Sequence, residues 1–229
     1  TMKETGLIHD EGPDIGGDYG PYIQSERRGI YQEYAKKLVE LGGAYYCFCD
    51  KERLDALREQ QEAAKLMPKY DGHCARLSKE EIEEKLASGV PYVIRQKIPK
   101  RGTTSFYDEI YGKITVDNAT LDDNVLLKSD GIPTYHFAHV VDDHLMRVTH
   151  VVRGEEWLSS LPLHLQLFKV LNFKAPKYLH ISLLMKQDGD SKRKLSKRKD
   201  PELSLDFYRK MGYHPAAVRE YLMTILNSN

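Results

Sequence analysis

The sequence predicts an α/β fold over residues 128–200, and three neighbouring segments support this class. A β-branched run at 148–152 is typical of a buried strand, and apolar residues at helical spacing follow from Trp157 to Phe168. A second apolar run covers 180–185. Strand, helix and strand in this order are characteristic of a parallel sheet covered by helices.

The composition excludes several classes of protein. The chain has 229 residues, of which 41% are apolar, with 15 Tyr and 6 Phe, so it can bury a core and is not intrinsically disordered. No apolar run approaches the ~20 residues that cross a bilayer, and no leader opens the sequence; we therefore expect no membrane partner and a cytoplasmic location. The 3 Cys cannot form a closed disulfide framework and fit a reducing compartment.

The first third of the chain is predicted as a loop followed by a helix. Residues 1–24 contain turn-forming Gly and Pro. Ser25 is a suitable N-cap, and Gly42 and Gly43 end the helix. The apolar stripe predicted for this helix consists of Ile30, Tyr34, Leu38 and Leu41.

The middle of the chain is predicted as mixed helix and strand. A polar helix starts near Lys51, and Ser78 with Glu81 forms a capping box for a second, short helix. The hydrophobic period then changes to two at 92–98, which indicates a half-buried strand. Two further strands are predicted at 113–116 and 125–127, and an amphipathic helix from Pro215 with Val218, Tyr221, Leu222 and Ile225 on one face.

The three cysteines favour a metal site. Cys47 and Cys49 are separated by one residue, and Cys74 follows in a Gly-containing turn that also holds Tyr70 and His73. A tetrahedral zinc site needs four ligands, which a Cys-x-Cys hairpin and a second short turn can supply. The alternative is three ordinary buried or loop thiols.

One segment concentrates positive charge. Residues 191–199, SKRKLSKRK, contain six basic residues and no acid, in a chain whose 34 Lys+Arg balance 34 Asp+Glu. Such a run is most often a solvated surface loop, and it also has the composition of a nuclear-localisation signal. Its place after an apolar run and a Gly turn supports a third reading, in which Lys194, Ser196 and Lys197 hold a polyphosphate.

These motifs together resemble bacterial-type glutamyl-tRNA synthetase, a class I aminoacyl-tRNA synthetase. KLSKR at 194–198 is similar to the Lys-Met-Ser-Lys-Ser signature loop of that class. The other matching segments, in chain order, are DEGP at 10–13, YIQSER at 22–27, DGIPTYHF at 130–137, VDDH at 141–144 and HVVRGEEW at 150–157.

The resemblance implies a Rossmann-type catalytic domain with an inserted domain. Residues 1–43 would be the remainder of the first Rossmann half, and 44–127 an inserted mixed α+β, zinc-bearing domain that binds the tRNA acceptor stem. Residues 128–200 would form the second Rossmann half with the signature loop, and 201–229 the start of a helical stem-contact domain. The expected early His-x-Gly-His segment is absent, so we expect a part of a longer enzyme that does not activate glutamate alone.

The resemblance also implies an activity, ATP-dependent ligation of L-glutamate to tRNA through glutamyl-adenylate, with Mg²⁺. The partners would be L-glutamate and tRNA-Glu, with tRNA-Gln left open, and the protein is expected to be a monomer. Two other functions remain open: a glutamyl-queuosine tRNA(Asp) synthetase, and a non-catalytic zinc-bearing module that binds the acceptor stem.

Arg153 is a candidate substrate ligand from its position alone. It ends a predicted strand, where the carboxyl ends of parallel strands border a ligand crevice, and its planar guanidinium suits a carboxylate. The alternative is an ion pair with Glu155 or Glu156. By resemblance, Arg153 and Tyr135 would bind glutamate, as would His139, which stands where part of the family has Asn.

The ATP and zinc ligands are also implied by the resemblance. The ATP-binding residues would be Glu156, Trp157, Leu183, Leu184, Lys194, Ser196 and Lys197, with Lys194 and Lys197 catalytic through their charge. Structural zinc would be held by Cys47, Cys49, Cys74 and a fourth ligand, for which Tyr70 ranks above His73. Other polar residues have weaker roles. His136 is expected to pack or to lie behind the ligand-contacting residues, and Asp142 and Asp143 either contact RNA hydroxyls or cap a helix, of which the cap is favoured. The remaining histidines are expected to be solvated or satisfied structural residues: His144, His150, His164 and His180.

Overall fold

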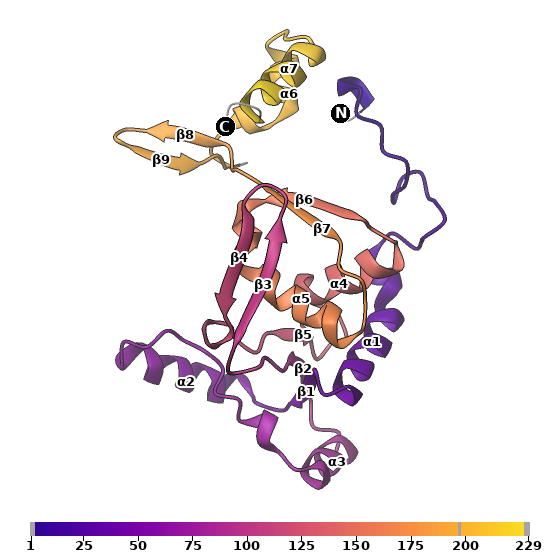
Figure 1. The fold of residues 1–229 in the computed structure, drawn as a ribbon, viewed down its shortest axis with the longest axis vertical. Coiled ribbons are helices and arrows are strands. Elements are labelled where there is room, and N and C mark those ends of the chain that lie inside the picture. Colours follow the sequence, from indigo (N-terminus) through magenta and orange to yellow (C-terminus); the bar gives the residue numbers. More distant parts are fainter. Residues whose placement is uncertain (1–2, 197, 227–229) are drawn as a thin grey trace.

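The predicted strand–helix–strand unit is present in the computed structural model, which describes residues 3–196 and 198–226 (Figure 1). Strand β6 (His150–Gly154) leads through a 3-10 turn at Glu155–Ser160 into helix α5 (Leu161–Val170). Strand β7 (Lys177–Ile181) then returns parallel to β6, in a register that places Arg153 opposite His180. It begins before the predicted run at 180–185, of which only His180 and Ile181 belong to this strand. The parallel pairing confirms the α/β prediction.

These two strands belong to a four-stranded sheet of order β4-β3-β7-β6. Strands β3 (Thr103–Asp108) and β4 (Gly112–Asp117) form an antiparallel hairpin, and β3 joins β7 in parallel through Asp108 and Tyr178. The sequence predicts β4 and misses β3. In β3 the alternate positions 103, 105 and 107 are exposed Thr, Ser and Tyr, so its apolar pattern is weak.

A second sheet has the order β1-β2-β5 and is antiparallel throughout. Its strands are β1 (Ala44–Cys47), β2 (Val93–Gln96) and β5 (Val125–Leu127). The period-two segment and the short apolar strand predicted from the sequence are therefore confirmed, whereas β1 was not predicted.

Helices α1 (Arg28–Glu40), α4 (Tyr135–Leu145) and α5 pack against the second sheet (Figure 1). The core that they share contains Tyr31, Leu38, Ile94, Leu126, Phe137, Val140, Leu167 and Phe168, each at most 1% exposed. The sequence does not predict α4, because its segment is rich in His and Val rather than in strong helix formers.

Two details of α1 differ from the prediction. Ser25 makes no cap hydrogen bond, because it lies inside a 3-10 turn (Gln24–Arg27) that precedes the helix. The buried positions of α1 are Tyr31, Ala35 and Leu38, while Leu41 is 51% exposed. Tyr31 can be buried because its hydroxyl donates a hydrogen bond to Asp142, at 2.7 Å, in the facing helix.

The remaining helices lie at the two ends of the molecule. Helices α2 (Lys51–Ala63) and α3 (Lys79–Ala87) extend from one end, and the predicted Ser78–Glu81 capping box of α3 is present (Figure 1). Helices α6 (Leu205–Lys210) and α7 (Pro215–Leu226) lie at the other end, which confirms the helix predicted from Pro215.

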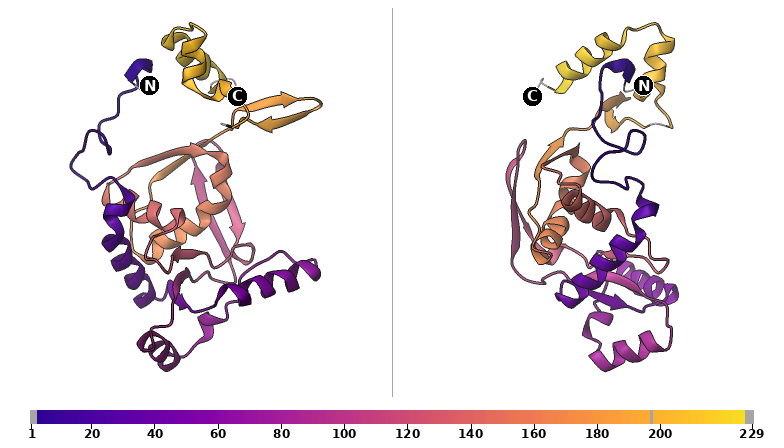
Figure 2. Two further views of the ribbon diagram at one scale, coloured as in Figure 1. Left: turned by 180° about the vertical axis from the view of Figure 1, so that it is seen from behind. Right: turned by 90° about the vertical axis from the view of Figure 1, so that its right-hand side faces the viewer.

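The basic segment is partly a strand and not wholly a loop. Strands β8 (Met185–Asp188) and β9 (Ser191–Lys194) form an antiparallel hairpin that projects from the body beside α6 (Figure 2). The hairpin forms because Gly189, at a φ of 61°, supplies a left-handed turn position after the apolar run. None of the helices in the described part of the chain has the length and apolarity to span a membrane.

Candidate functional site

Arg153 lies at the end of β6 within a cluster of aromatic and imidazole rings. Its Nε donates a hydrogen bond to Nε2 of His180 at 3.0 Å, and one terminal nitrogen donates to the Tyr135 hydroxyl at 3.3 Å. The guanidinium also lies over the rings of Tyr178 and Trp157, at 5.2 and 5.8 Å from their centroids. These contacts hold the cation without neutralising it.

The two acids next to Arg153 in the sequence do not pair with it. Glu155 accepts a hydrogen bond from the Tyr111 hydroxyl at 2.5 Å, and Glu156 lies 2.7 Å from the ammonium of Lys194. Among the described residues, no Asp or Glu forms an ion pair with Arg153. The alternative ion pair considered from the sequence is therefore wrong, and the guanidinium remains available to an anionic ligand.

Tyr135 and Trp157 border the same place. Their ring centroids are 4.3 Å apart, and Tyr135 is 45% exposed. His139 stacks on Tyr135 but is only 9% exposed, and its nitrogens lie 2.6 Å from Asp143 and 3.3 Å from the Tyr178 hydroxyl. Both ring nitrogens of His139 thus face protein groups, while nearly half of Tyr135 is exposed.

Two further histidines lie behind this cluster. Nδ1 of His136 is 2.9 Å from Nε2 of His164, and Nδ1 of His164 is 3.5 Å from a terminal nitrogen of Arg153. His164 is fully buried, and this burial, helped by the charge of Arg153, lowers its pKa far below the ordinary value. Both imidazoles are neutral at physiological pH, since burial also lowers the pKa of His136.

The β8–β9 hairpin leads into the signature segment 194–198 and is called the signature hairpin below. The buried carboxylate of Asp200 holds it. Asp200 accepts two hydrogen bonds from Arg193 at 2.6 and 2.7 Å and one from the backbone N–H of Ser196 at 2.8 Å. Lys186 lies 3.5 Å away on β8. The hydrogen bonds from Arg193 and Ser196 hold the pKa of Asp200 well below its usual range. The basic segment is therefore partly neutralised and ordered by acids, rather than a free basic loop.

The other predicted nucleotide ligands lie at the base of this hairpin. Lys194 reaches Glu156 in the turn after β6, and the carbonyl of Leu184 accepts a hydrogen bond from Leu195 at 3.0 Å. Leu183 and Leu184 line a hollow of about 360 Å³ between the hairpin and helix α7, together with Leu195. Lys197 lies outside the described residues.

The three cysteines come together as the sequence predicts. Their sulfur atoms lie within 4.8 Å of one another, and the Tyr70 hydroxyl lies 3.4 Å from Cys47 and 3.3 Å from Cys49. Cys47 ends β1, and Cys74 begins a 3-10 turn. The strand end and the turn bring the four side chains to one point, and this cluster fits a zinc ion in the donor set and in size.

The surroundings of the sulfurs suit thiolates. Arg95 donates to Cys47 at 3.3 Å, Arg53 to Cys49 at 3.5 Å, and the backbone N–H of Phe48 to Cys74 at 3.4 Å. Without a metal, burial raises the pKa of Cys49 to about 12. Hydrogen bonds to sulfur from cations and backbone would stabilise the charge that a divalent ion requires.

Tyr70 and His73 are placed differently around the sulfurs. The hydroxyl of Tyr70 is directed into the cluster and accepts a hydrogen bond from the backbone N–H of Cys74 at 3.0 Å. Tyr70 is 8% exposed, whereas His73 is an exposed residue at the rim. The geometry favours Tyr70 as the fourth ligand.

Asp142 and Asp143 do not cap a helix, which corrects the prediction. Both lie near the end of α4, where Asp142 receives hydrogen bonds from Arg27 at 2.8 Å and from Tyr31. Arg27 is 2% exposed, so this pair joins α1 to α4 inside the protein. Asp143 lies beside His139, one turn earlier in α4.

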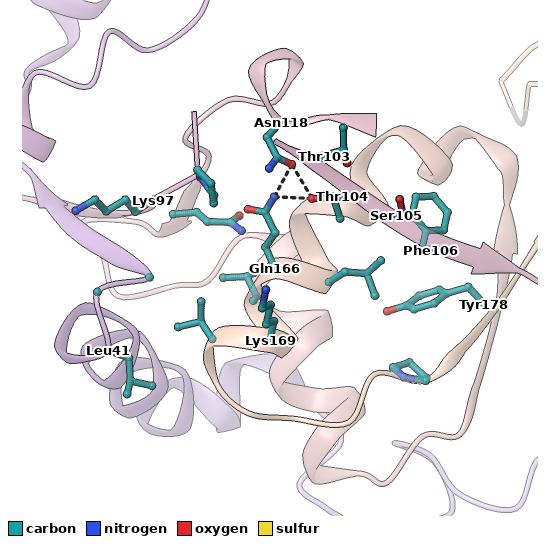
Figure 3. Close-up of a pocket in the computed structure, with 18 of the residues that line it drawn as sticks. Leu41, Lys97, Thr103, Thr104, Ser105, Phe106, Asn118, Gln166, Lys169 and Tyr178 are labelled. Carbon is teal, nitrogen blue, oxygen red and sulfur yellow. Dashed lines mark hydrogen bonds between the residues drawn. The ribbon is translucent and has the colours of Figure 1, made fainter. Parts of the chain in front are cut away.

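A separate cavity of about 870 Å³ lies between the β3–β4 hairpin and α5 (Figure 3). Gln166 of α5 extends toward Thr104 and Asn118, and donates to them at 3.0 and 3.2 Å (Figure 3). Of the predicted site residues that the structure describes, none lines this cavity.

A Rossmann-like parallel unit with a signature hairpin defines a class I aminoacyl-tRNA synthetase catalytic domain. Residues 7–227 match the family described as class I tRNA synthetases (E and Q), catalytic domain, and the chain belongs to this family.

The relatives that were found are more specific. The chain is 59% identical over 222 residues to a glutamate–tRNA ligase of Clostridium botulinum and 57% identical over 212 residues to one of Fusobacterium nucleatum. These matches cover 97% and 93% of this chain but only 45% and 41% of the relatives, so the chain spans about half of their length or less.

A solved glutamate–tRNA ligase from Elizabethkingia meningosepticum, in complex with its amino acid, superposes with a TM-score of 0.84 at 39% identity. The superposition covers 93% of this chain and 47% of that one.

Three residues with clear roles in this geometry were missed from the sequence. Asp108 contacts His180, His180 contacts Arg153, and Asp200 holds the signature hairpin. Asp108 and His180 are 72 residues apart, so no local spacing could relate them. For Asp200, its position directly after the basic segment was the available signal.

Proposed function

We propose that this chain provides the glutamate-binding, signature-loop and acceptor-stem parts of an enzyme that ligates L-glutamate to tRNA with ATP. The observation that carries the proposal is Arg153, a half-buried cation without an acidic partner among the described residues, beside the partly exposed Tyr135. A planar guanidinium beside a polar aromatic rim suits an amino acid with two carboxylates.

The chemistry would be carried by positioning and by charge. Arg153 would bind a glutamate carboxylate and Tyr135 would line the pocket, so that the α-carboxylate can attack the α-phosphate of ATP. Lys194 and Lys197 would stabilise the negative charge that develops on the phosphates, and Ser196 would hold a phosphate oxygen. Mg²⁺ would enter with ATP and neutralise phosphate charge. No protein nucleophile is required, since a ribose hydroxyl of tRNA takes the glutamyl group.

The nucleotide would lie along the hairpin base. Glu156 and Trp157 would border the ribose and the adenine, and the backbone at Leu183 and Leu184 would face the adenine edge. Support for this arrangement is the Lys194–Glu156 contact, which brings the hairpin to the end of β6. His139 would act behind Tyr135, because it is only 9% exposed and its ring nitrogens face protein groups.

Zinc would be structural. Cys47, Cys49 and Cys74 with Tyr70 would fill all four positions, so no open position would remain for a substrate. The domain boundaries that go with this proposal are 1–43, 44–127, 128–200 and 201–229, with the zinc-bearing part contacting the acceptor stem. The protein would be a cytoplasmic monomer that charges tRNA-Glu. Charging of tRNA-Gln should be compared with it, since tRNA-Gln is the second possible substrate.

The test is a chimera in which the 222 matching residues of this chain replace their counterparts in the Clostridium tetani glutamate–tRNA ligase, a relative with 59% identity. We expect the chimera to charge tRNA-Glu with glutamate. Arg153→Gln should raise the KM for glutamate about 10- to 150-fold, because a hydrogen-bonded charge pair contributes ~1.5–3 kcal/mol. Lys36→Gln, which removes an exposed cation of α1, is the matched control.

A folded chimera that charges no tRNA, or an unchanged KM in Arg153→Gln, would refute the proposal. Charging of tRNA(Asp) instead of tRNA-Glu would indicate the glutamyl-queuosine reaction, and acceptor-stem binding without charging would indicate a non-catalytic module.

A further inference from the structure

We infer that Asp108 and His180 are positioning residues that set the orientation of Arg153 by keeping His180 in a single tautomer. The structural part of this inference stands on its own, and its meaning for glutamate rests on the proposed function. Neither residue belongs to a motif that the sequence singles out, and neither is expected to touch the substrate.

The three side chains form a continuous line across three strands. Oδ2 of Asp108, at the end of β3, lies 2.7 Å from Nδ1 of His180 on β7. On the opposite side of the same ring, Nε2 accepts from Nε of Arg153 on β6 at 3.0 Å. The strands place these residues in line, because Arg153 and His180 are direct partners in the β6–β7 register.

Only one placement of protons allows both hydrogen bonds of His180 to form. An ionised carboxylate only accepts hydrogen bonds, and a guanidinium only donates them. The proton of a neutral His180 must therefore lie on Nδ1, facing Asp108, so that the lone pair of Nε2 faces Arg153. The other tautomer, and likewise the doubly protonated ring, would place an N–H against the N–H of Arg153.

Asp108 is suited to fix that tautomer. Both it and His180 have no exposed surface, so water cannot replace either partner. Its second oxygen, Oδ1, accepts hydrogen bonds from the backbone N–H groups of Ile110 and Tyr111, each at 3.0 Å. Burial alone would raise the pKa of Asp108, but the hydrogen bonds from His180 and from these two N–H groups lower it overall, so the carboxylate stays ionised.

The consequence for Arg153 is a fixed direction. With Nε held by His180, the terminal nitrogens extend toward Tyr135 and His164, at 3.3 and 3.5 Å. An arginine held only by ring contacts could turn about its long side chain, and ordering it would then oppose ligand binding. The Asp108–His180 pair orders Arg153 before the ligand arrives.

If His180 had only a structural role, the order of Arg153 would follow the stability of each variant. Two substitutions distinguish this from a positioning role. His180→Gln keeps an acceptor near the position of Nε2, facing Arg153, but removes the donor to Asp108. His180→Asn keeps a donor near Nδ1, facing Asp108, but removes the acceptor to Arg153. If His180 positions Arg153, the Arg153 side chain stays ordered in His180→Gln and becomes disordered in His180→Asn, whichever variant is the more stable.

Asp108→Asn tests the tautomer. If the new amide group faces His180, it donates to Nδ1 and moves the proton to Nε2, against Arg153. If it turns the other way, it faces the two backbone N–H donors. In either orientation two N–H donors face each other without an acceptor. The Nε–Nε2 hydrogen bond or the turn after β3 must therefore be lost.

The measurement is ¹⁵N NMR on the 229-residue chain, with His and Arg side chains labelled. We expect the wild type to show a proton on Nδ1 of His180, a scalar coupling across the Arg153 Nε–His180 Nε2 hydrogen bond, and slow exchange of the Arg153 Nε–H. His180→Gln should retain slow exchange and His180→Asn should lose it. Asp108→Asn should lose either the coupling or the protection of the backbone N–H groups of Ile110 and Tyr111. His150→Gln, on the exposed face of β6, is the control and should change none of these signals.

A proton on Nε2 in the wild type, or equal Arg153 exchange in the Gln and Asn variants, would overturn the inference. In the chimera described above, His180→Asn should raise the KM for glutamate about tenfold while His180→Gln raises it less, as expected for one lost hydrogen bond. If the NMR signals behave as expected but no variant changes glutamate binding, the positioning is correct and the proposed substrate is wrong.

Discussion

Nζ of Lys194 lies 2.7 Å from Oε1 of Glu156, and this ion pair connects the end of strand β9 to the turn after β6. Both residues are proposed ligands of the same nucleotide, Lys194 for its phosphates and Glu156 for its ribose. In the absence of a nucleotide, each therefore satisfies the other. A phosphate that binds Lys194 has to displace the carboxylate, and this competition is open to measurement.

We predict that Glu156→Gln strengthens the binding of inorganic tripolyphosphate to the 229-residue chain, because it removes the carboxylate that competes for Lys194. Tripolyphosphate has no ribose, so the loss of a ribose contact does not obscure the result. The pair is exposed and contributes at most ~1 kcal/mol, so the gain should not exceed about fivefold. Titration calorimetry at low salt gives the affinity.

Glu155→Gln is the matched control for this measurement, since Glu155 accepts from Tyr111 and does not contact Lys194. Weaker binding in Glu156→Gln than in the wild type would show that Glu156 supports the phosphate site rather than competing with it.

A second prediction concerns the fourth zinc ligand. Tyr70→Phe should weaken zinc binding by at least about tenfold, because the hydroxyl lies among the three sulfurs, whereas His73→Asn should leave it unchanged. Competition with a chromophoric chelator gives the affinity, and cobalt substitution reports the ligand set by its visible absorption. The opposite order of the two variants would assign His73.

Chelation of zinc should lower the stability of the part around the cysteines, since a structural site contributes its binding free energy to folding. Cys74→Ser is expected to abolish stoichiometric binding. Retention of one tightly bound zinc per chain in Cys74→Ser would place the metal elsewhere.

A third prediction concerns Asp200 and the signature hairpin. Asp200→Asn removes the charge that holds Arg193 and the backbone of Ser196, so the amide hydrogen of Ser196 should exchange faster with solvent. Asp188→Asn removes the other, exposed carboxylate that contacts Arg193 and should have a much smaller effect. Hydrogen exchange followed by NMR distinguishes the two variants, and equal exchange rates would contradict a special role of Asp200.

The fourth prediction is a pH dependence of stability from His164. Burial lowers its pKa in the folded state, with further lowering by the neighbouring His139, Arg153 and His136, whereas in the unfolded chain it titrates near the ordinary ~6.5. Below that pH the unfolded state binds a proton that the folded state does not. The free energy of unfolding should therefore fall by ~1.4 kcal/mol per pH unit as the pH decreases below ~6.5.

Urea denaturation between pH 7 and pH 5 measures this slope. His164→Gln should reduce it, and His150→Gln, at an exposed position, should not change it. An unaltered slope in His164→Gln would show that other groups carry the pH dependence.

Much of the fold could be predicted because its signals are local. The capping box at Ser78 and Glu81, the period-two segment of β2 and the β-branched run of β6 are each encoded within a few residues. Helix α4 and strand β3 could not be predicted in this way. Both have weak intrinsic patterns and form because the surrounding elements bury one of their faces.

The phase of α1 shows the same limit. Of the predicted stripe, Leu38 is buried and Ile30 and Tyr34 pack against the core, but Leu41 is exposed, and the structure also buries Tyr31 and Ala35. The choice depends on Asp142, 111 residues away, which accepts the hydrogen bond that makes a buried tyrosine hydroxyl tolerable.

The sequence by itself determined the class of the fold, the signature segment and the grouping of Cys47 with Cys49, since residue type and short spacing are enough to specify them. The tertiary structure decided which charges are left without a partner. Glu155 and Glu156 are next to Arg153 in the chain, yet Tyr111 and Lys194 engage them, while Asp108 approaches through His180 from another strand. Sheet register and side-chain direction set these contacts, and neither can be derived from separation along the chain.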